Sequence, residues 1–250
     1  MQFYSMTDRG KQRENNEDCC IARQLGEYTV LILADGMGGH KGGETASSKA
    51  VETVFAYLSK KLKKKLIAGQ IMLLLSDALE LANNEIYTLS QKNEKLGGMG
   101  TTAEVCVIAS NTAYIAHIGD SRVYKVSSTG EIKRLTKDHS LVEYMVEKGS
   151  ITREEAALHP QKNVIMRALG VSPDVDADIF HEKLDKGDRL LLCSDGLSNM
   201  IDEETIASVL VGAPSPQEGA QKLIQLANEA GGADNITVII SMPDYMEENE

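Results

Sequence analysis

Short apolar runs, separated by a few polar or glycine residues, recur along most of the chain. They are rich in β-branched residues, which is typical of strands, and their close spacing predicts antiparallel hairpins. The expected strands are DCCIAR, EYTVLILA, TTAEVCVIA, TAYIAHIG, SRVYKV, EIKRL, ADIFHEKL, DRLLLCS and NITVIISM.

Three longer segments instead carry apolar residues at helical spacing: residues 44–66, 70–91 and 216–230. The first two follow each other without a strand between them, which argues against regular alternation of strands and helices. The pattern therefore predicts an α+β protein in which helices cover antiparallel sheets. Because neither an internal repeat nor a low-complexity linker divides residues 1–250, we expect a single domain.

Residues 136–170, hereafter the excursion, break this pattern with short helical pieces and a proline. Such a long excursion in a compact domain is often a functional lid, although a plain structural insertion fits nearly as well. Within it, Asp138 and His139 precede a predicted helix start. A lone histidine in that place is more often a structural cap than a catalytic group.

The composition argues against nucleic acid and membranes as partners. With 37 acidic and 26 basic side chains the net charge is −11, which repels phosphate backbones and anionic lipid. The most basic stretch, residues 59–66, has leucines on one helix face, so we expect a solvated lysine face there. Three of the four cysteines lie in apolar runs, none has a paired spacing, and no leader or membrane-spanning run is visible. We therefore expect a monomeric cytoplasmic protein.

Aspartates stand at the ends of the most apolar predicted strands. Singly, each fits a turn role, because Asp-Gly and Gly-Asp are common turn dipeptides. Together, at one edge of a sandwich, their carboxylates would repel one another unless cations were bound. These residues are Asp18, Asp35, Asp120, Asp195 and Asp234.

The ligand type selects the metal. Oxygen ligands suit Mg²⁺ or Mn²⁺, and the chain has no His/Cys cluster with zinc-like spacing. In LADGMGGHKGGE the glycines would let the backbone turn sharply after Asp35, so that the Gly36 carbonyl also faces a metal. Two adjacent oxygens could in this way serve two ions.

Other phosphate chemistries do not fit the sequence. GGHKGGET has the glycine spacing of a P-loop, but Glu44 stands where that loop needs a lysine. A cysteine-based phosphatase needs an arginine six residues after its cysteine, and no cysteine here has one. Neither a nucleophile elbow nor a kinase glycine loop occurs.

Motifs in a fixed order span nearly the whole chain: RENNED, DGMGGHKGGE, GGMGTT, HIGDSRVY, LTKDHS, MRALG, CSDGLSN and GGADNITVI. In this order they resemble the metal-dependent serine/threonine protein phosphatases of the protein phosphatase 2C family, in its compact bacterial form. The resemblance implies a central β-sandwich of two antiparallel sheets flanked by helix pairs, in α/β/β/α layers. It also implies a binuclear metal centre at one edge.

The resemblance further implies roles for the matched residues at two Mn²⁺ or Mg²⁺ ions. Asp35 would bridge both ions, and the Gly36 carbonyl would bind the second. Asp195 and Asp234 match the positions that hold the first ion.

Further matched residues would surround these ions. Glu17 and Asp18 would lie beside the second ion, and either could act directly or through water. Asp120, together with Asp195, matches a third and looser site found in bacterial members. Arg13 matches the arginine that binds phosphate, although an exposed turn residue is its alternative reading.

Two-metal chemistry then predicts a metal-bridging hydroxide that attacks phosphorus in line, while the metals and Arg13 stabilise the developing charge. Some family members are thought to use a histidine two positions after the bridging aspartate as proton donor, where this chain has Met37. His40, in the same loop, is a candidate donor, and a metal-bound water is the main alternative. The excursion corresponds to a flap beside the active site.

The expected function is hydrolysis of phosphoserine and phosphothreonine in proteins, opposing a bacterial serine/threonine kinase. The expected partners are accordingly phosphoproteins and that cognate kinase. A phosphohydrolase for small phosphate esters remains an alternative, because metals and Arg13 would grip phosphate without reading what is attached. A catalytically silent regulatory module is a second alternative, but it would lack an acid at Asp35, Asp195 or Asp234, and none is missing.

Overall fold

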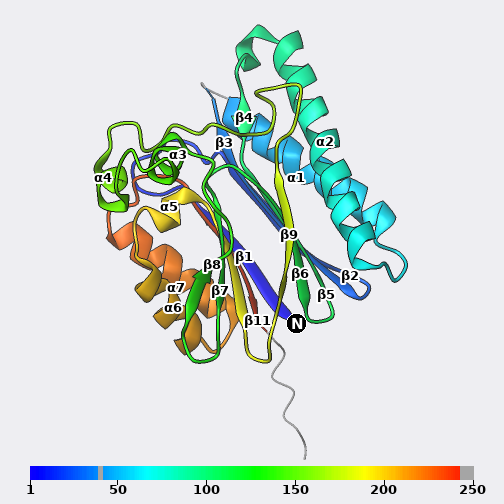
Figure 1. Ribbon diagram of the computed structural model, residues 1–250, viewed down its shortest axis with the longest axis vertical. Coiled ribbons are helices and arrows are strands. Elements are labelled where there is room, and N and C mark those ends of the chain that lie inside the picture. Colours follow the sequence, from blue (N-terminus) through cyan, green and yellow to red (C-terminus); the bar gives the residue numbers. More distant parts are fainter. Residues whose placement is uncertain (39–41, 243–250) are drawn as a thin grey trace, which may run out of the picture.

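The computed structural model describes residues 1–38 and 42–242. Two antiparallel sheets pack face to face (Figure 1). The first consists of β1 (Gln2–Asp8), β11 (Ile236–Met242), β10 (Arg189–Cys193), β7 (Arg122–Val126) and β8 (Ile132–Arg134), in that spatial order. The second consists of β2 (Asp18–Leu25), β3 (Tyr28–Met37), β5 (Ala103–Ala109), β6 (Thr112–Ile118) and β9 (Asp178–Lys183), with β4 (Gly100–Thr101) beside β3.

Helices cover the outer face of each sheet. Figure 1 shows α1 (Gly42–Lys61) and α2 (Ala68–Lys92) on one side of the sandwich, and α6 (Glu203–Gly212) and α7 (Pro216–Glu229) on the other. A short 3₁₀ helix, η1 (Glu94–Leu96), follows α2. The remaining helices, α3 (Leu141–Glu147), α4 (Arg153–Leu158) and the short α5 (Asp195–Ser198), gather at one end of the molecule.

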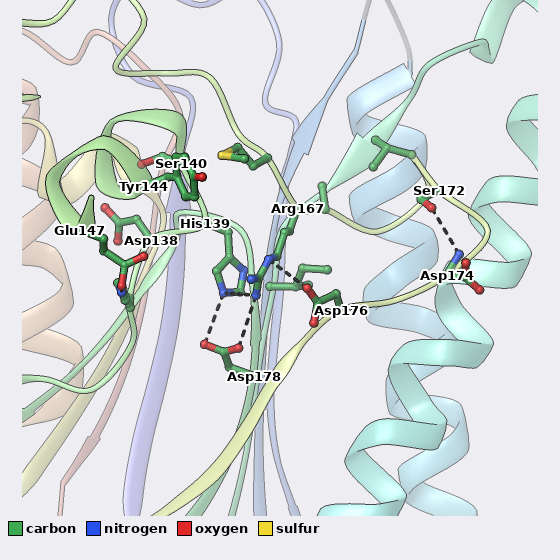
Figure 2. A pocket seen from close by; sticks show the side chains of 15 residues that line it. Asp138, His139, Ser140, Tyr144, Glu147, Arg167, Ser172, Asp174, Asp176 and Asp178 are labelled. Carbon is green, nitrogen blue, oxygen red and sulfur yellow. Dashed lines mark hydrogen bonds and ion pairs between the residues drawn. The ribbon is translucent and has the colours of Figure 1, made fainter. Parts of the chain in front are cut away.

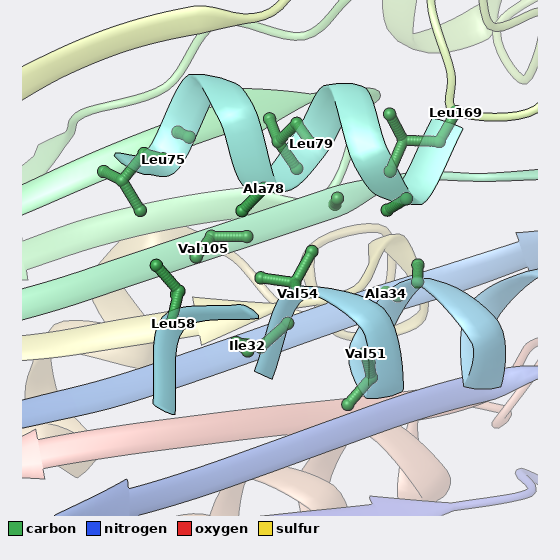
Figure 3. Packing of buried hydrophobic residues seen from close by; sticks show 14 of the residues in the cluster. Ile32, Ala34, Val51, Val54, Leu58, Leu75, Ala78, Leu79, Val105 and Leu169 are labelled. Atoms are coloured by element: carbon green, nitrogen blue, oxygen red, sulfur yellow. The ribbon is translucent and has the colours of Figure 1, made fainter. Parts of the chain in front are cut away.

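Three apolar layers hold this arrangement together. The largest lies between the second sheet and the helices α1 and α2, where Ile32, Val54 and Leu79 are buried (Figure 3). A second fills the space between the sheets, and a third lies between the first sheet and α6 and α7. The α/β/β/α sandwich implied by the motifs is therefore confirmed.

The described residues contain all the strands and helices that the apolar pattern predicts; beyond the very short β4, η1 and α5, they add two elements that it does not. One is β1, an edge strand whose mixed sequence QFYSMTD lacks a clean alternation. The other is α6, which is short and apolar but begins with the cap residue Asp202, whose side chain accepts a hydrogen bond from Thr205 N. Across the described ranges, none of the helices combines the length and apolar character that crossing a bilayer requires.

The antiparallel order brings the expected acidic strand ends together. The start of β2 lies opposite the end of β3, and the end of β10 lies beside the start of β11. Because β6 runs in the same direction as β3, its end points to this edge as well. One edge of the sandwich thus collects polar ends from both sheets.

Candidate metal centre

Five aspartates converge at this edge. Asp18 and Asp35 are partners in the β2–β3 register. Asp120 follows β6, Asp195 follows β10, and Asp234 precedes β11. Burial raises the pKa of Asp35 well above its ordinary value, and the charges of the other four carboxylates raise it further. The predicted crowding of acids is therefore present in the fold.

Asp18 is held by hydroxyl groups of the opposite sheet. Its Oδ2 accepts hydrogen bonds from Ser194 Oγ at 2.8 Å and from Thr237 Oγ1 at 2.6 Å. Its Oδ1 is buried and has no hydrogen-bond partner among residues 1–38 and 42–242. Burial raises the pKa of Asp18 to about 7, although both hydroxyls oppose this shift. One oxygen of Asp18 is thus fixed, and the other is left for a ligand.

Threonines fix the backbone around Asp35. Asp35 N donates to Thr102 Oγ1 at 2.9 Å, and Asp35 O accepts from Thr102 N at 2.9 Å and from Thr101 Oγ1 at 2.8 Å. Thr102 Oγ1 also lies 2.9 Å from Ser121 Oγ, near the start of β7. These bonds occupy the backbone polar groups of Asp35 and leave its carboxylate out of the network.

Gly36 is needed for close packing rather than for a turn, contrary to the expectation that the chain bends sharply after Asp35. β3 continues through Gly36 to Met37. A Cβ on Gly36 would lie 2.2 Å from Gly43 O and 2.6 Å from Glu17 O, so any side chain would clash with backbone. Gly36 N also donates to Glu17 O at 3.1 Å. The absence of a side chain lets α1 and the segment before β2 approach this strand end.

Asp120 and Asp195 border a cavity of about 330 Å³. Asp120 Oδ1 is buried without a partner, and burial, followed by the charge of Asp195, raises the pKa of Asp120 to about 8. Burial and then the charge of Asp234 raise the pKa of Asp195 to about 6. Asp195 Oδ2 accepts from Asn199 Nδ2 at 3.0 Å. The two acids therefore face a space large enough for a small ligand.

Arg13 contacts one member of this group of acids. Its Nη2 lies 2.7 Å from Asp234 Oδ2, and half of its side chain stays exposed. Asn235 fixes the loop that carries Arg13, because its Nδ2 donates to Arg9 O and Asn15 O, both at 2.9 Å. Arg13 is thus an exposed residue that an ion pair with Asp234 holds beside the acids.

Glu17 belongs to the same loop. Its backbone N donates to Asn235 Oδ1 at 2.8 Å. Burial raises the pKa of Glu17, and the positive charge of Arg13 opposes this shift. Glu17 is therefore next to the acids but lacks the hydroxyl contacts that hold Asp18.

The residues at this edge fit a hard divalent cation. The buried, unpartnered Oδ1 atoms of Asp18 and Asp120 would be costly without a compensating charge or donor. Carboxylate and carbonyl oxygens are the ligands that Mg²⁺ and Mn²⁺ prefer. Among residues 1–38 and 42–242, no three His, Cys, Asp or Glu side chains form a closed ligand set.

Some residues of the site could not be assigned a role from the sequence. Thr102, Ser194 and Asn235 lie inside the quoted motifs, but nothing in the pattern gave them a role. A polar residue next to a strand-end acid is the signal that could have found them. His40, the candidate proton donor, lies outside the described residues.

The excursion lies beside the centre and borders a larger cavity of about 610 Å³. Asp138 and Ser140 line both cavities, and Figure 2 shows the larger one with Arg167 and Asp178. The expectation that His139 caps a helix is wrong. The N-cap of α3 is Ser140, which accepts from Glu143 N, while His139 turns toward β6.

A β-sandwich with helix pairs on its outer faces and acids from both sheets at one edge defines the class of metal-dependent phosphatases. The family model described as Protein phosphatase 2C matches residues 7–228, and the chain belongs to this family. The resemblance seen in the motifs is thereby confirmed.

Individual proteins similar to this chain support the same assignment. The serine/threonine phosphatase stp of Listeria monocytogenes is 39% identical over 235 residues, covering 94% of this chain and 92% of its own. The structure of Stp1 from Staphylococcus aureus superposes with a TM-score of 0.89 at 34% identity. The match covers 97% of this chain and 94% of that one. A PstP catalytic domain in complex with two manganese ions superposes with a TM-score of 0.84 at 38% identity. The match covers 97% of this chain and 98% of that one.

Proposed function

We propose that this protein removes phosphate from phosphoserine and phosphothreonine in other proteins, opposing a serine/threonine kinase. The observation that carries the proposal is the set of carboxylates from both sheets, which leaves one oxygen of Asp18 and one of Asp120 buried without a partner. The named relatives are serine/threonine phosphatases, which supports this class of substrate. We further propose that residues 1–250 act as one domain, with the excursion as a flap over the site.

Two divalent ions, with a third and looser one, would occupy the centre. Asp35 would contact both tighter ions, with Asp195 and Asp234 on the first and the Gly36 carbonyl on the second. When bound, Mn²⁺ or Mg²⁺ supplies a water-derived nucleophile at neutral pH and neutralises charge on the phosphoryl group.

The outer ligands follow from the contacts of each residue. Asp18 offers its free Oδ1 directly, because Ser194 and Thr237 fix the other oxygen. Glu17, which lacks such contacts, would act through water. Asp120 would serve the third ion together with Asp195.

The chain's own groups would bind and orient the phosphate. Arg13 is held by Asp234 and still exposes its guanidinium, so it would donate to two phosphoryl oxygens. The leaving alkoxide needs a proton, and His40 and a metal-bound water are the two candidate donors. Substrate would enter over the cavity between Asp120, Asp195 and the excursion.

Phosphate release from a phosphothreonine peptide tests the proposal. EDTA-stripped protein would be titrated with Mn²⁺ and Mg²⁺, beside Asp35→Asn and the control Asp185→Asn, an exposed acid with 74% of its side chain accessible. Turnover should appear only with metal, should fall by more than about a hundredfold in Asp35→Asn, and should persist in the control. Folded protein that binds metal but releases no phosphate would instead be a regulatory module. Turnover confined to small esters would identify a small-ester phosphohydrolase.

A further inference from the structure

His139 holds both backbone polar groups of the residue that precedes Asp120. Its own N donates to Gly119 O at 2.7 Å, and its Nδ1 accepts from Gly119 N at 3.2 Å. His139 is 8% exposed. A single residue at the start of the excursion therefore forms two hydrogen bonds with the loop that carries Asp120.

The opposite side of this loop is fixed by Thr102. Gly119 has a φ of 120°, which favours glycine, and a Cβ there would lie 2.5 Å from Thr102 Cγ2. Thr102 is also the residue whose hydroxyl accepts from Asp35 N. Gly119 is thus packed between His139 and the threonine that orients Asp35.

The ring of His139 is fixed in one orientation. A backbone N–H only donates, so Nδ1 must accept, and the neutral ring carries its proton on Nε2. Nε2 lies 3.4 Å from Asp178 Oδ2, and Arg167 lies 3.6 Å from the other oxygen of that carboxylate (Figure 2). The ring also packs against His117, with 4.5 Å between centroids. Burial, followed by the charge of His117, lowers the pKa of His139 to about 4, in keeping with a neutral ring.

We propose that His139 is a positioning residue that fixes the Gly119–Asp120 loop and so holds Asp120 in place to bind a metal ion. It does not touch the phosphate or the ions. The inference rests on the proposed function, because it takes Asp120 as a metal ligand. It explains why the histidine stands next to the helix cap without serving as one.

The test compares two variants of this residue with a matched control. His139→Ala removes the acceptor for Gly119 N, while His139→Asn places an amide oxygen close to the position of Nδ1. The control is His159→Ala, since His159 Nδ1 also accepts a backbone N–H, that of Gln161 at 3.1 Å, but within the excursion. Each EDTA-stripped protein would be titrated with Mn²⁺ by isothermal calorimetry, and circular dichroism would establish that it is folded.

We expect the affinity for the most weakly bound Mn²⁺ to fall roughly tenfold in His139→Ala and to return largely in His139→Asn. His159→Ala should bind as the unchanged protein does. With p-nitrophenyl phosphate, His139→Ala should lose kcat at low Mn²⁺ and regain it at saturating Mn²⁺, with an unchanged KM. A merely structural role would not give this recovery.

Equal Mn²⁺ binding by all folded variants would overturn the inference, as would an Asn variant as weak as the Ala variant. If His139→Ala does not fold, the Asn variant decides alone, because near-normal binding supports the acceptor role and a tenfold loss contradicts it. Failure of the proposed function is a separate result: the unchanged protein would bind Mn²⁺ but release no phosphate from the phosphopeptide. Absence of Mn²⁺ binding by the unchanged protein would overturn both.

Discussion

Asp18 and Asp35 are register partners on adjacent antiparallel strands, so their carboxyl groups leave the second sheet side by side at one edge. Like charges so close are unfavourable in a buried site. The fold nevertheless fixes one oxygen of Asp18 with two hydroxyls and anchors the backbone of Asp35 with two threonines. These contacts hold two acids close together, which is understandable if both bind the same cation.

Thr102→Val tests the anchoring of Asp35. The variant keeps the shape of the side chain but leaves Asp35 N and Ser121 Oγ without this partner. We expect about 1–3 kcal/mol lower stability and 10–100-fold weaker Mn²⁺ binding. Urea unfolding and calorimetric titration measure the two effects.

Thr29→Val is the matched control for that change. Thr29 is another buried threonine, near the start of β3, and its hydroxyl donates to Gln24 Oε1. It should lose stability without a change in Mn²⁺ affinity. If both variants weaken Mn²⁺ binding alike, Thr102 has no special part in the centre.

Arg13→Ala should raise the KM for phosphopeptide and lower kcat/KM by about 10–100-fold, since the guanidinium would bind the phosphoryl group. Arg13→Lys should recover only part of this loss, because an ammonium group cannot bind two oxygens in the same plane. The control is Arg9→Ala, which removes an arginine of the same segment that donates to Glu14 O. A steady-state assay in which all three variants behave alike would contradict a role in phosphate binding.

Gly36→Ala and Gly69→Ala should have opposite effects. An added Cβ at Gly36 meets backbone at 2.2 Å, so the variant should lose about 1–3 kcal/mol or more and bind Mn²⁺ more weakly. Gly69 lies in α2 with open space around it, so alanine should stabilise the protein by up to about 1 kcal/mol. Thermal unfolding of both variants checks the contrast, and a tolerated alanine at position 36 would show that the strand end can shift.

A buried ion pair should make the stability of the folded protein depend on pH. Glu104 Oε1 lies 2.6 Å from His117 Nδ1, and both side chains are fully buried. Burial alone would lower the pKa of His117, but Glu104 outweighs it and raises the pKa to about 9. Burial raises the pKa of Glu104 to about 7, although His117 opposes this. Because both folded pKa values are raised, bound protons stabilise the folded state at low pH.

The stabilisation from His117 should be complete below its ordinary pKa of 6.5 and lost as the pH rises through about 9. Between about pH 6.5 and pH 9.5, the free energy of unfolding should fall by up to about 3 kcal/mol more than in the double variant Glu104→Gln, His117→Gln. Asp138 and Asp178 also act on this pair, and they remain in both proteins. Urea unfolding measures this free energy in both proteins at several pH values. If it depends on pH in the same way in both, the pair does not titrate as described.

The acids of the centre were predictable because each stands next to a strong local pattern. Asp35, Asp120 and Asp195 follow apolar strands in Asp-Gly or Gly-Asp pairs, and antiparallel pairing then gathers strand ends. The motif order supplied the rest of the expected ligand set. Periodicity also sufficed for the long helices, since α1 and α2 each bury a continuous apolar face.

What escaped prediction depends on contacts between distant segments. Ser194 and Thr237 lie 176 and 219 residues from Asp18, and no local pattern joins them to it. β1 was missed because its partner strand, β11, is at the other end of the chain. The helix cap was misassigned to His139 although serine is the better N-cap residue, and the contact that His139 does make, with Gly119, joins segments 20 residues apart.

The hydrogen bonds that Asp18 accepts from Ser194 and Thr237 join the two sheets at the acidic end. Sheets that touch only through apolar side chains have no directional contacts to resist sliding, whereas bonds across the gap oppose shear. In mechanical terms, the sandwich is held against sliding at both ends, because an ion pair between Lys125 of β7 and Glu182 of β9 also joins the sheets at the end away from the acids.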